Sequence, residues 1–206
     1  MKRQASTTKG KETLALIKQA TAQVLLEEGI DRATTNRIAE KAGISIGTLY
    51  QYYEHKEEIF AELLNDLVEA RRGRVRAVLD LGVVVQPIER IVHDVVDAVF
   101  DAPDPRDAPL EIFLLPLLFR SNDEENAMRK FESFESTLAP FVKALLLLKK
   151  PNLVKRDLDA AIFVMVQALR GTFLGLAAPG ATQPRVSKDK VKTEVKRLLL
   201  AYLEAD

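Results

Sequence analysis

The chain has 206 residues, which is long enough for one large domain or two modest ones with a buried core. Its 30 Lys and Arg residues equal its 30 Asp and Glu residues, so the whole-chain charge indicates neither a nucleic acid nor a membrane as a partner. Cysteine is absent, which excludes disulfides, thiolate nucleophiles and cysteine-ligated zinc. The N-terminal segment MKRQASTTKGKE lacks the apolar run of a secretory signal, and we therefore expect a soluble cytoplasmic protein with no membrane partner.

The balanced total hides an asymmetry along the chain. Residues 1–56 carry nine Lys and Arg against six Asp and Glu, a net charge of +3, whereas the remaining residues carry 21 against 24. All four charges in the first eleven residues are positive, at Lys2, Arg3, Lys9 and Lys11. This N-terminal part suits a polyanionic partner, but a charge of this size does not identify one.

Apolar residues recur at helical spacing along almost the whole chain, and no segment alternates with a period of two, so we predict an all-α fold. The first helix should cover residues 9–28 and end at Gly29 in a left-handed conformation. A second helix should follow Thr34 as its N-cap and end at Gly43. Ser45 should then cap a third helix.

The third helix should run to about Tyr53, and a fourth should begin near His55. Beyond residue 80 the predicted helices are longer and more apolar. Pro116 and Pro140 lie inside these helical patterns, so each should mark a kink or a helix start. The sequence thus predicts a small polar three-helix unit followed by a larger apolar bundle.

Two short helices separated by the residues GIS fit a helix-turn-helix arrangement, in which the second helix enters the major groove of DNA. With about 100° of rotation per residue, Leu49, Tyr53 and Ile46 share one face of that helix, and Gly47 and Gln51 lie opposite. An exposed glycine in a short helix costs roughly 0.5–1 kcal/mol relative to alanine. Gly47 is explained if another backbone, such as a DNA strand, approaches there.

Three of the four tyrosines of the chain lie within residues 50–53, and the helical wheel divides them. Tyr53 is predicted to be buried, Tyr50 to be exposed with its hydroxyl free, and Tyr52 to lie between the two faces. Lys56, in the first turn of the next helix, opposes the helix dipole, and this unfavourable placement is explained by contact with phosphate.

The stretch TTNRIAEKAGISIGTLYQYYEHKEEIFAELL, residues 34–64, resembles the DNA-binding signature of the TetR/AcrR family of transcriptional regulators. The family pattern T-x-x-x-I-A-x-x-A-G-[VI]-S-x-G-[TS]-[LI]-Y-x-[HY]-F-x-x-K-[ED]-x-L is matched almost throughout, with Tyr53 in place of the usual Phe. The resemblance implies a helix-turn-helix DNA-binding domain, residues 1–56, and a helical effector-binding and dimerisation domain, residues 57–206. The implied DNA-binding positions, with Ile46 and Gly47 included, are Thr35, Asn36, Ser45, Ile46, Gly47, Thr48, Tyr50, Gln51, Tyr52 and Lys56.

The residue types at these positions match the two kinds of DNA contact. Asn36 and Gln51 carry amides that can form two hydrogen bonds to adenine, whereas Tyr, Ser, Thr and Lys suit phosphate oxygens. Ile46 departs from the family, which often has a lysine or another polar residue there. It either touches a thymine methyl group or packs towards Leu49 and Tyr53, and the helical wheel favours packing.

The segment LDAAIFVMVQALRGTFLGLAA, residues 158–178, is apolar on more than one face, which predicts a helix buried on more than one side. Gln167 and Arg170 interrupt it and argue against a membrane span. Together with the last helix, whose predicted apolar stripe includes Val191 and Leu198, it suits a four-helix interface between two subunits. The alternative is an intramolecular core helix. The expected interface residues are Gly171, Gly175, Val195, Leu199 and Tyr202.

The family resemblance also implies a small-molecule cavity inside the bundle, although each candidate lining residue, taken alone, fits an ordinary core better than a ligand contact. Such a lining suits an apolar effector with one polar or anionic end, held by Gln167 and Arg170. The apolar candidates are Phe113, Leu117, Phe134, Phe141, Phe163, Met165 and Phe173.

A metal-dependent enzyme or sensor is a further alternative, because Glu89, His93, Asp97 and Asp101 recur at the helical spacing of metal ligands. The apolar stripe that contains Val92 points these four residues to the opposite, solvated face, so we favour no metal, no cofactor and no catalytic residue.

Together these features predict a ligand-responsive transcriptional repressor. It should bind a roughly palindromic double-stranded DNA operator as a homodimer and be released by a small, mostly apolar effector. The alternative is a helical ligand-binding dimer that has lost DNA recognition, for which the apolar Ile46 is the main indication.

Overall fold

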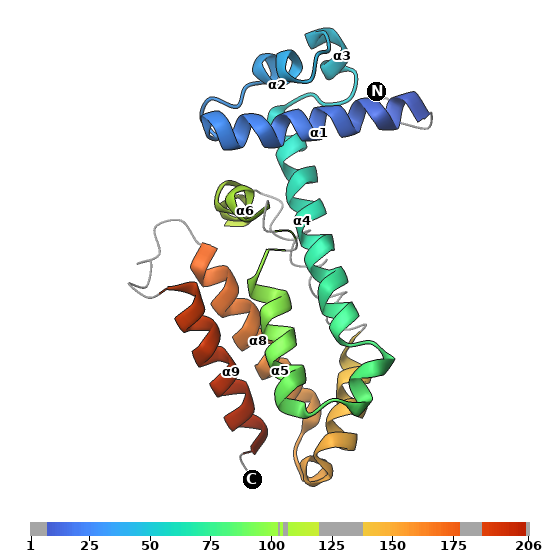
Figure 1. Cartoon of the computed structure of the whole chain (residues 1–206), viewed down its shortest axis with the longest axis vertical. Helices are drawn as coiled ribbons and strands as arrows, with labels where there is room; N and C mark the ends of the chain where they lie inside the picture. The colour runs from blue at the N-terminus through green and yellow to red at the C-terminus, as the bar shows by residue number, and fades with distance from the viewer. Residues whose placement is uncertain (1–7, 103, 105–106, 120–137, 178–186, 205–206) are drawn as a thin grey trace. The chain divides into compact units, whose positions relative to one another are not determined.

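The computed structural model describes residues 8–102, 104, 107–119, 138–177 and 187–204, and its regular structure over these residues is helical, without strands (Figure 1). The all-α prediction is therefore confirmed. The chain divides into two compact units, the first formed by Met1–Glu69 with Asp104–Leu115 and the second by Ala70–Pro103 with Pro116–Asp206. The long helix α4 (Lys56–Val78) contributes residues to both units.

The first unit contains α1 (Thr8–Glu28), α2 (Thr35–Lys41), α3 (Ile46–Tyr50), the start of α4, and α6 (Ala108–Leu114). Figure 1 shows α2 and α3 along one side of α1. Ile17, Thr21, Val24 and Leu25 of α1 are buried and form the inward-facing stripe of this helix. Gly29 ends this helix with a φ of 81°, as predicted, because this left-handed conformation is unstrained for glycine.

Side-chain caps define the two short helices. The Thr34 hydroxyl accepts a hydrogen bond from the Arg37 amide at 3.3 Å and begins α2, and Ser45 accepts one from Thr48 at 3.0 Å and begins α3. Gly43, with a φ of 67°, ends α2 as predicted. The helix α3 ends at Tyr50, however, and not near Tyr53 as expected.

The second unit is built around α5 (Ile88–Phe100), α8 (Leu158–Ala177) and α9 (Lys188–Glu204), which pack side by side. A helical segment over residues 138–149 and the 3-10 turns η1 (Leu81–Val85) and η4 (Pro151–Lys155) complete its described part. Its buried core consists of Val83, Ile88, Ile91, Val92, Val96, Phe100, Leu145, Leu146, Leu153, Leu158, Ile162, Val195, Leu199 and Leu203.

The two prolines expected to mark a kink or a helix start both lie in helical segments. Pro116 falls in the 3-10 turn η3 (Leu115–Phe119), which directly follows α6, so the α-helical form ends just before this proline. Pro140 lies within the described helical segment 138–149, and its role as a kink or a helix start stays a prediction.

The prediction that α8 is buried on more than one side is wrong for the single chain. Among its described side chains only Leu158, Ala161 and Ile162 are buried, while Phe163 is 63% and Val164 47% exposed. The stretch Leu158–Leu176 is also long and apolar enough, by composition alone, to cross a membrane, although core helices of soluble proteins pass the same test.

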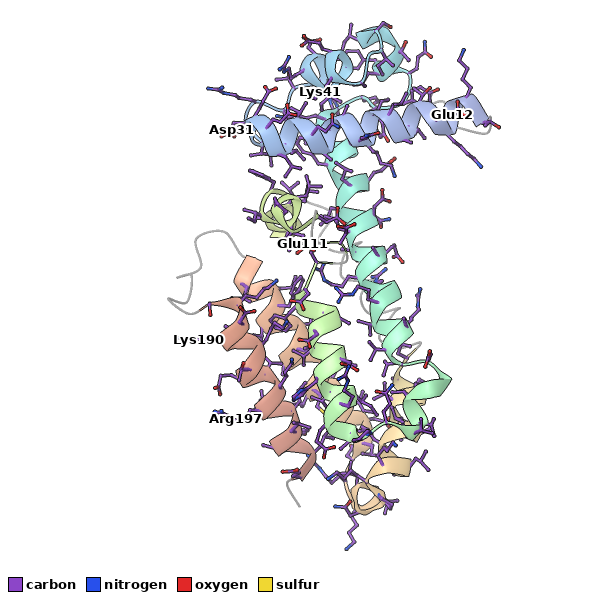
Figure 2. The ribbon with its side chains drawn as sticks, in the orientation of Figure 1. Glu12, Asp31, Lys41, Glu111, Lys190 and Arg197 are labelled. Carbon is purple, nitrogen blue, oxygen red and sulfur yellow. The ribbon has the colours of Figure 1, made fainter. Side chains whose placement is uncertain are left out.

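The last helix also differs from its predicted stripe. Val195, Leu199 and Leu203 are buried, but Leu198 is 54% exposed, so it does not share their face. Figure 2 shows Lys190 and Arg197 projecting from the side of α9 that is turned away from α5. The helix therefore has one face packed in its own unit and one face bearing both charged and apolar residues.

The four acidic and histidine residues of α5 do not all lie on a solvated face, which corrects the prediction. Glu89 and His93 are exposed, but Asp97 and Asp101 face α9. Lys192 Nζ lies 2.9 Å from Asp97 Oδ1, and Lys196 Nζ lies 2.8 Å from the same oxygen. No three His, Asp or Glu residues in the described part of the chain are grouped to hold a metal ion.

Two arginines of α4 hold the C-terminal end of α5. Arg71 Nε donates to the Val99 carbonyl at 2.8 Å, and Arg74 Nη1 donates to the carbonyls of Asp101 at 3.0 Å and Ala102 at 2.9 Å. Carbonyls at a helix end have no partner within their own helix, so these bonds satisfy them. The final turns of α4 are thereby attached to α5.

Candidate nucleic-acid interface

The helix pair α2–α3 is held in place by a small buried face. Ile38 and Ala39 of α2 and Leu49 of α3 are almost inaccessible to solvent. The turn between the helices is fixed at its two ends by Gly43 and Ser45. These residues determine the frame of the pair, and Asn36, Gly47 and Tyr50 lie exposed on it.

The three clustered tyrosines occupy distinct positions. Tyr53 is 2% exposed and Tyr50 is 52% exposed, which confirms that the first is buried and that the ring of the second is exposed. Tyr52, predicted to lie between the faces, is 7% exposed and belongs to the core. The Tyr53 hydroxyl donates to Glu62 Oε2 at 2.7 Å, and burial, followed by this carboxylate, raises the pKa of Tyr53.

The hydroxyl of Tyr50 is not free, contrary to the prediction. It lies 3.2 Å from the Thr35 hydroxyl, so the exposed end of α3 is linked to the start of α2. Ser45 Oγ lies 2.8 Å from Thr48 Oγ1. The exposed side of the helix pair thus presents four hydroxyl groups in two hydrogen-bonded pairs.

The other predicted DNA-binding residues are distributed around these hydroxyls. Asn36, Gly47 and Gln51 are exposed, and Ile46 and Lys56 are half-buried. A Cβ atom added to Gly47 would meet only Ser45 Oγ, at 3.8 Å, which is ordinary contact. Among the residues that the structure describes, no packing contact therefore requires a glycine at this position.

The cations of α2 were not singled out by the sequence analysis. Arg37 Nε lies 2.6 Å from Glu28 and its Nη1 lies 2.7 Å from Glu40, and Lys41 Nζ lies 2.7 Å from Glu27. The hydrogen bond to Glu28, followed by that to Glu40, raises the pKa of Arg37. The adjacent acids at the end of α1 were the signal in the sequence, but their partners depend on how α1 packs on α2.

The residues predicted for a subunit interface differ in how much solvent exposure they have in the single chain. Gly171 and Gly175 are exposed, with nothing within 4 Å of an added Cβ atom. Val195 and Leu199 are buried inside their own unit. Tyr202 is half-buried, and its ring centroid lies 4.5 Å from the Arg156 guanidinium of the same chain.

The described effector-binding candidates fall in both units of the chain. Phe113 belongs to the first unit, and Leu117, half-buried, to the second. Phe163 is exposed, which corrects its expected place inside the bundle. Phe134, like the basic residues Lys2 and Arg3, lies outside the described residues.

Three further candidates are partly buried against the core of the second unit: Phe141, Met165 and Phe173. The two polar candidates bind each other, since Arg170 Nη2 donates to Gln167 Oε1 one turn away on α8. The described candidates therefore comprise three apolar residues packed against the core and one hydrogen-bonded polar pair on α8.

Two family models cover most of the chain. The model described as "Bacterial regulatory proteins, tetR family" matches residues 17–63, and that described as "Tetracyclin repressor-like, C-terminal domain" matches residues 84–203, which is more than half of the chain. The chain belongs to the TetR family. It is therefore a DNA-binding transcriptional regulator with a helix-turn-helix unit, as the resemblance of residues 34–64 implied.

Curated helix-turn-helix transcriptional regulators match at moderate identity. The repressor KstR2 of Mycolicibacterium smegmatis is 30% identical over 95 residues, which is 46% of this chain and 45% of that protein, so less than half of KstR2 is spanned. The regulator PksA of Bacillus subtilis is 24% identical over 192 residues, covering 92% of this chain and 87% of PksA. These relatives are transcriptional regulators.

Solved structures share the TetR fold. A TetR/AcrR-family regulator from Thermobifida fusca has a TM-score of 0.66 at 19% identity and covers 92% of this chain and 97% of that one. FadR from Thermus thermophilus, in complex with lauroyl-CoA, has a TM-score of 0.58 at 21% identity, with 91% and 93% coverage. At these identities the likeness concerns the fold alone.

Proposed function

We propose that this TetR-family protein is a cytoplasmic, ligand-responsive repressor that binds a roughly palindromic operator as a homodimer and has no enzymatic activity. The observation that carries this proposal is the group of hydroxyls on the outer face of α2 and α3, including the linked pair Thr35 and Tyr50. Hydroxyls at a helix pair of this geometry suit phosphate oxygens on either side of a major groove.

Each exposed residue then has a distinct role in DNA binding. Tyr50 and Lys56 contact phosphate, whereas the amides of Asn36 and Gln51 contact base edges. Gly47 permits close approach of the DNA backbone, because this position is exposed and carries no side chain of its own. Tyr52 supports α3 from the buried side.

The experiment is a DNA titration against the promoter region of the protein's own gene, at several salt concentrations. Tyr50→Ala and Lys56→Ala should both weaken binding. Lys56→Ala should also flatten the plot of log affinity against log salt by about one unit, since one phosphate contact is lost. Lys190→Ala, on an exposed part of α9, is the matched control. Unchanged binding in both test variants would overturn the proposal in favour of a ligand-binding dimer without DNA recognition.

The exposed apolar residues of the second unit support a homodimer. Phe163 and Val164 of α8 and Leu198 of α9 are large apolar side chains that the single chain leaves exposed. Gly171 and Gly175 would allow a second helix to approach α8 closely. A second copy of the chain covers all of these residues in the proposed dimer.

The proposed effector has an apolar body and one polar or anionic end. The partly buried apolar residues Phe141, Met165 and Phe173 supply the apolar surface, and the Gln167–Arg170 pair supplies the polar one. The structure of FadR with lauroyl-CoA supports this class, because that protein shares the fold. Native mass spectrometry of the purified protein would identify a retained molecule together with the dimer mass.

Release from DNA is proposed to involve α4. Arg71 and Arg74 attach its final turns to the end of α5, and its first residue is Lys56, a proposed phosphate contact. An effector that binds better when α4 is displaced would shift the population towards a geometry that no longer fits the operator.

A further inference from the structure

The two cations of α2, Arg37 and Lys41, are of the residue types that bind DNA phosphates, but each is held in an ion pair with a carboxylate. Arg37 is held between two carboxylates, 2.6 Å from Glu28 and 2.7 Å from Glu40. Lys41 lies 2.9 Å and 2.7 Å from the two oxygens of Glu27. Glu27 and Glu28 are the last two residues of α1, so the end of that helix places a carboxylate against each cation.

This cluster has no excess of positive charge. Three carboxylates, those of Glu27, Glu28 and Glu40, surround the two cations. The Glu28 side chain is only 21% exposed, so its pairing with Arg37 is less weakened by water and salt than an open surface pair. The first helix of the helix-turn-helix pair therefore presents hydroxyl and amide groups to DNA but little net positive potential.

Sequence-independent affinity for DNA comes mainly from cations that contact phosphates and release counterions. We propose that Glu27 and Glu28 are specificity-determining residues, which limit the attraction of unrelated DNA by holding Arg37 and Lys41 in ion pairs. This inference rests on the proposed DNA contact of α2 and α3. Discrimination between DNA sites then depends on the uncharged groups of the interface, because the electrostatic, sequence-independent part of the affinity is kept low.

The same ion pairs would also be expected if they served only to attach α2 to α1. The two roles make different predictions. A purely structural role lowers thermal stability when a carboxylate is removed and leaves the salt dependence of DNA binding unchanged. A role in specificity changes the salt dependence, because a released cation becomes available to a phosphate.

The test measures binding of the full chain to a random-sequence DNA duplex by fluorescence anisotropy, at salt concentrations from about 50 to 200 mM. Glu27→Gln, Glu28→Gln and the double variant keep the side-chain shape and remove the charge. For each cation that gains a phosphate, the slope of log affinity against log salt should steepen by about 0.9. Over that fourfold rise in salt, this means an about 3.5-fold greater loss of affinity per cation.

The matched control is Asp66→Asn. It also removes one carboxylate from an ion pair of the first unit, that with Lys18, but neither residue belongs to α2 or α3. Its slope should stay at the wild-type value. Melting temperatures of all variants show whether the helix pair remains folded, and Glu40→Gln, which leaves Glu28 on Arg37, should have a smaller effect than Glu28→Gln.

An unchanged slope in the double variant, or an equal increase in Asp66→Asn, would overturn the inference while leaving the proposed function intact, provided that the wild-type chain binds its own promoter. Absence of binding to both the promoter and the random duplex by the wild-type chain would overturn the two proposals together. A steeper slope confined to the variants at the end of α1 would support the inference.

Discussion

The ammonium group of Lys192 on α9 lies 2.8 Å from both carboxylate oxygens of Asp101 at the end of α5. The Lys192 side chain is only 14% exposed and also contacts Asp97. Burial alone would lower the pKa of Lys192, but Asp101 and Asp97 outweigh it and raise that pKa. The pairing thus joins two helices of the second unit through charges that are partly withdrawn from water.

Asp97 should make the second unit sensitive to acid. Burial alone would raise its pKa, but Lys196 and Lys192 outweigh burial and lower it. Because the folded-state pKa lies below the unfolded one, Asp97 contributes stability above the unfolded pKa, near pH 4. That contribution is lost as pH falls through the folded pKa. Urea unfolding between about pH 3 and 7 should show this loss, and Asp97→Asn should reduce it. An identical pH profile for the variant would contradict the assignment.

Tyr53→Phe should destabilise the protein slightly without affecting DNA binding. The variant loses the hydrogen bond of 2.7 Å to Glu62, which is worth about 0.5–1.5 kcal/mol. The ring keeps its buried place, so the promoter affinity should remain at the wild-type value. Chemical denaturation and a DNA titration measure the two effects separately.

Tyr50→Phe is the matched comparison, because it removes a hydroxyl that is exposed and bonded to Thr35. We expect the opposite pattern, weaker DNA binding and a free energy of unfolding within about 0.5 kcal/mol of wild type. If both variants changed stability alone, the assignment of Tyr50 to the DNA surface would fail.

Gln51→Ala should alter specificity more than affinity. A side-chain amide that forms two hydrogen bonds to adenine contributes about 1–3 kcal/mol of discrimination against other bases. Selection of binding sites from a randomised duplex library should therefore show relaxed preference at one position in each half-site. Retention of the wild-type preference at every position would show that Gln51 does not contact a base.

Phe163→Glu should disrupt the proposed dimer, because a charge would replace an apolar side chain that is 63% exposed on α8. A loss of at least about 2 kcal/mol, or about 30-fold in Kd, is expected for a central interface residue. Light scattering after size-exclusion chromatography measures the mass. Val154→Glu, at an exposed valine of η4, introduces the same charge elsewhere and should leave the mass unchanged. A persistent dimer in Phe163→Glu would exclude this face.

The features that could be predicted from the sequence are those set by local spacing. Helix starts at Thr34 and Ser45 follow from the capping ability of their hydroxyls, and the ends at Gly29 and Gly43 follow from the conformational freedom of glycine. The helical wheel failed for Tyr52 because it assumes a continued helix, whereas α3 ends at Tyr50. A residue beyond the last turn is oriented by the connecting segment and not by the helical period.

Contacts between elements could not be predicted from spacing. The bond between Thr35 and Tyr50 joins two helices, and its existence depends on the angle at which they pack. The exposure of Phe163 illustrates a second limit. An apolar pattern predicts that a helix face is buried, but it does not distinguish burial within one chain from burial against a second chain.

The frame of the helix pair is maintained by residues that do not take part in the exposed surface. Leu49 and Ile38 anchor the two helices, and Gly43 shapes the turn between them. Asn36, Gly47 and Gln51 contribute nothing to that buried face. Exchanges of exposed side chains such as these usually change stability by no more than about 0.5 kcal/mol. Operator preference can therefore diverge, or be re-engineered, on an unchanged scaffold.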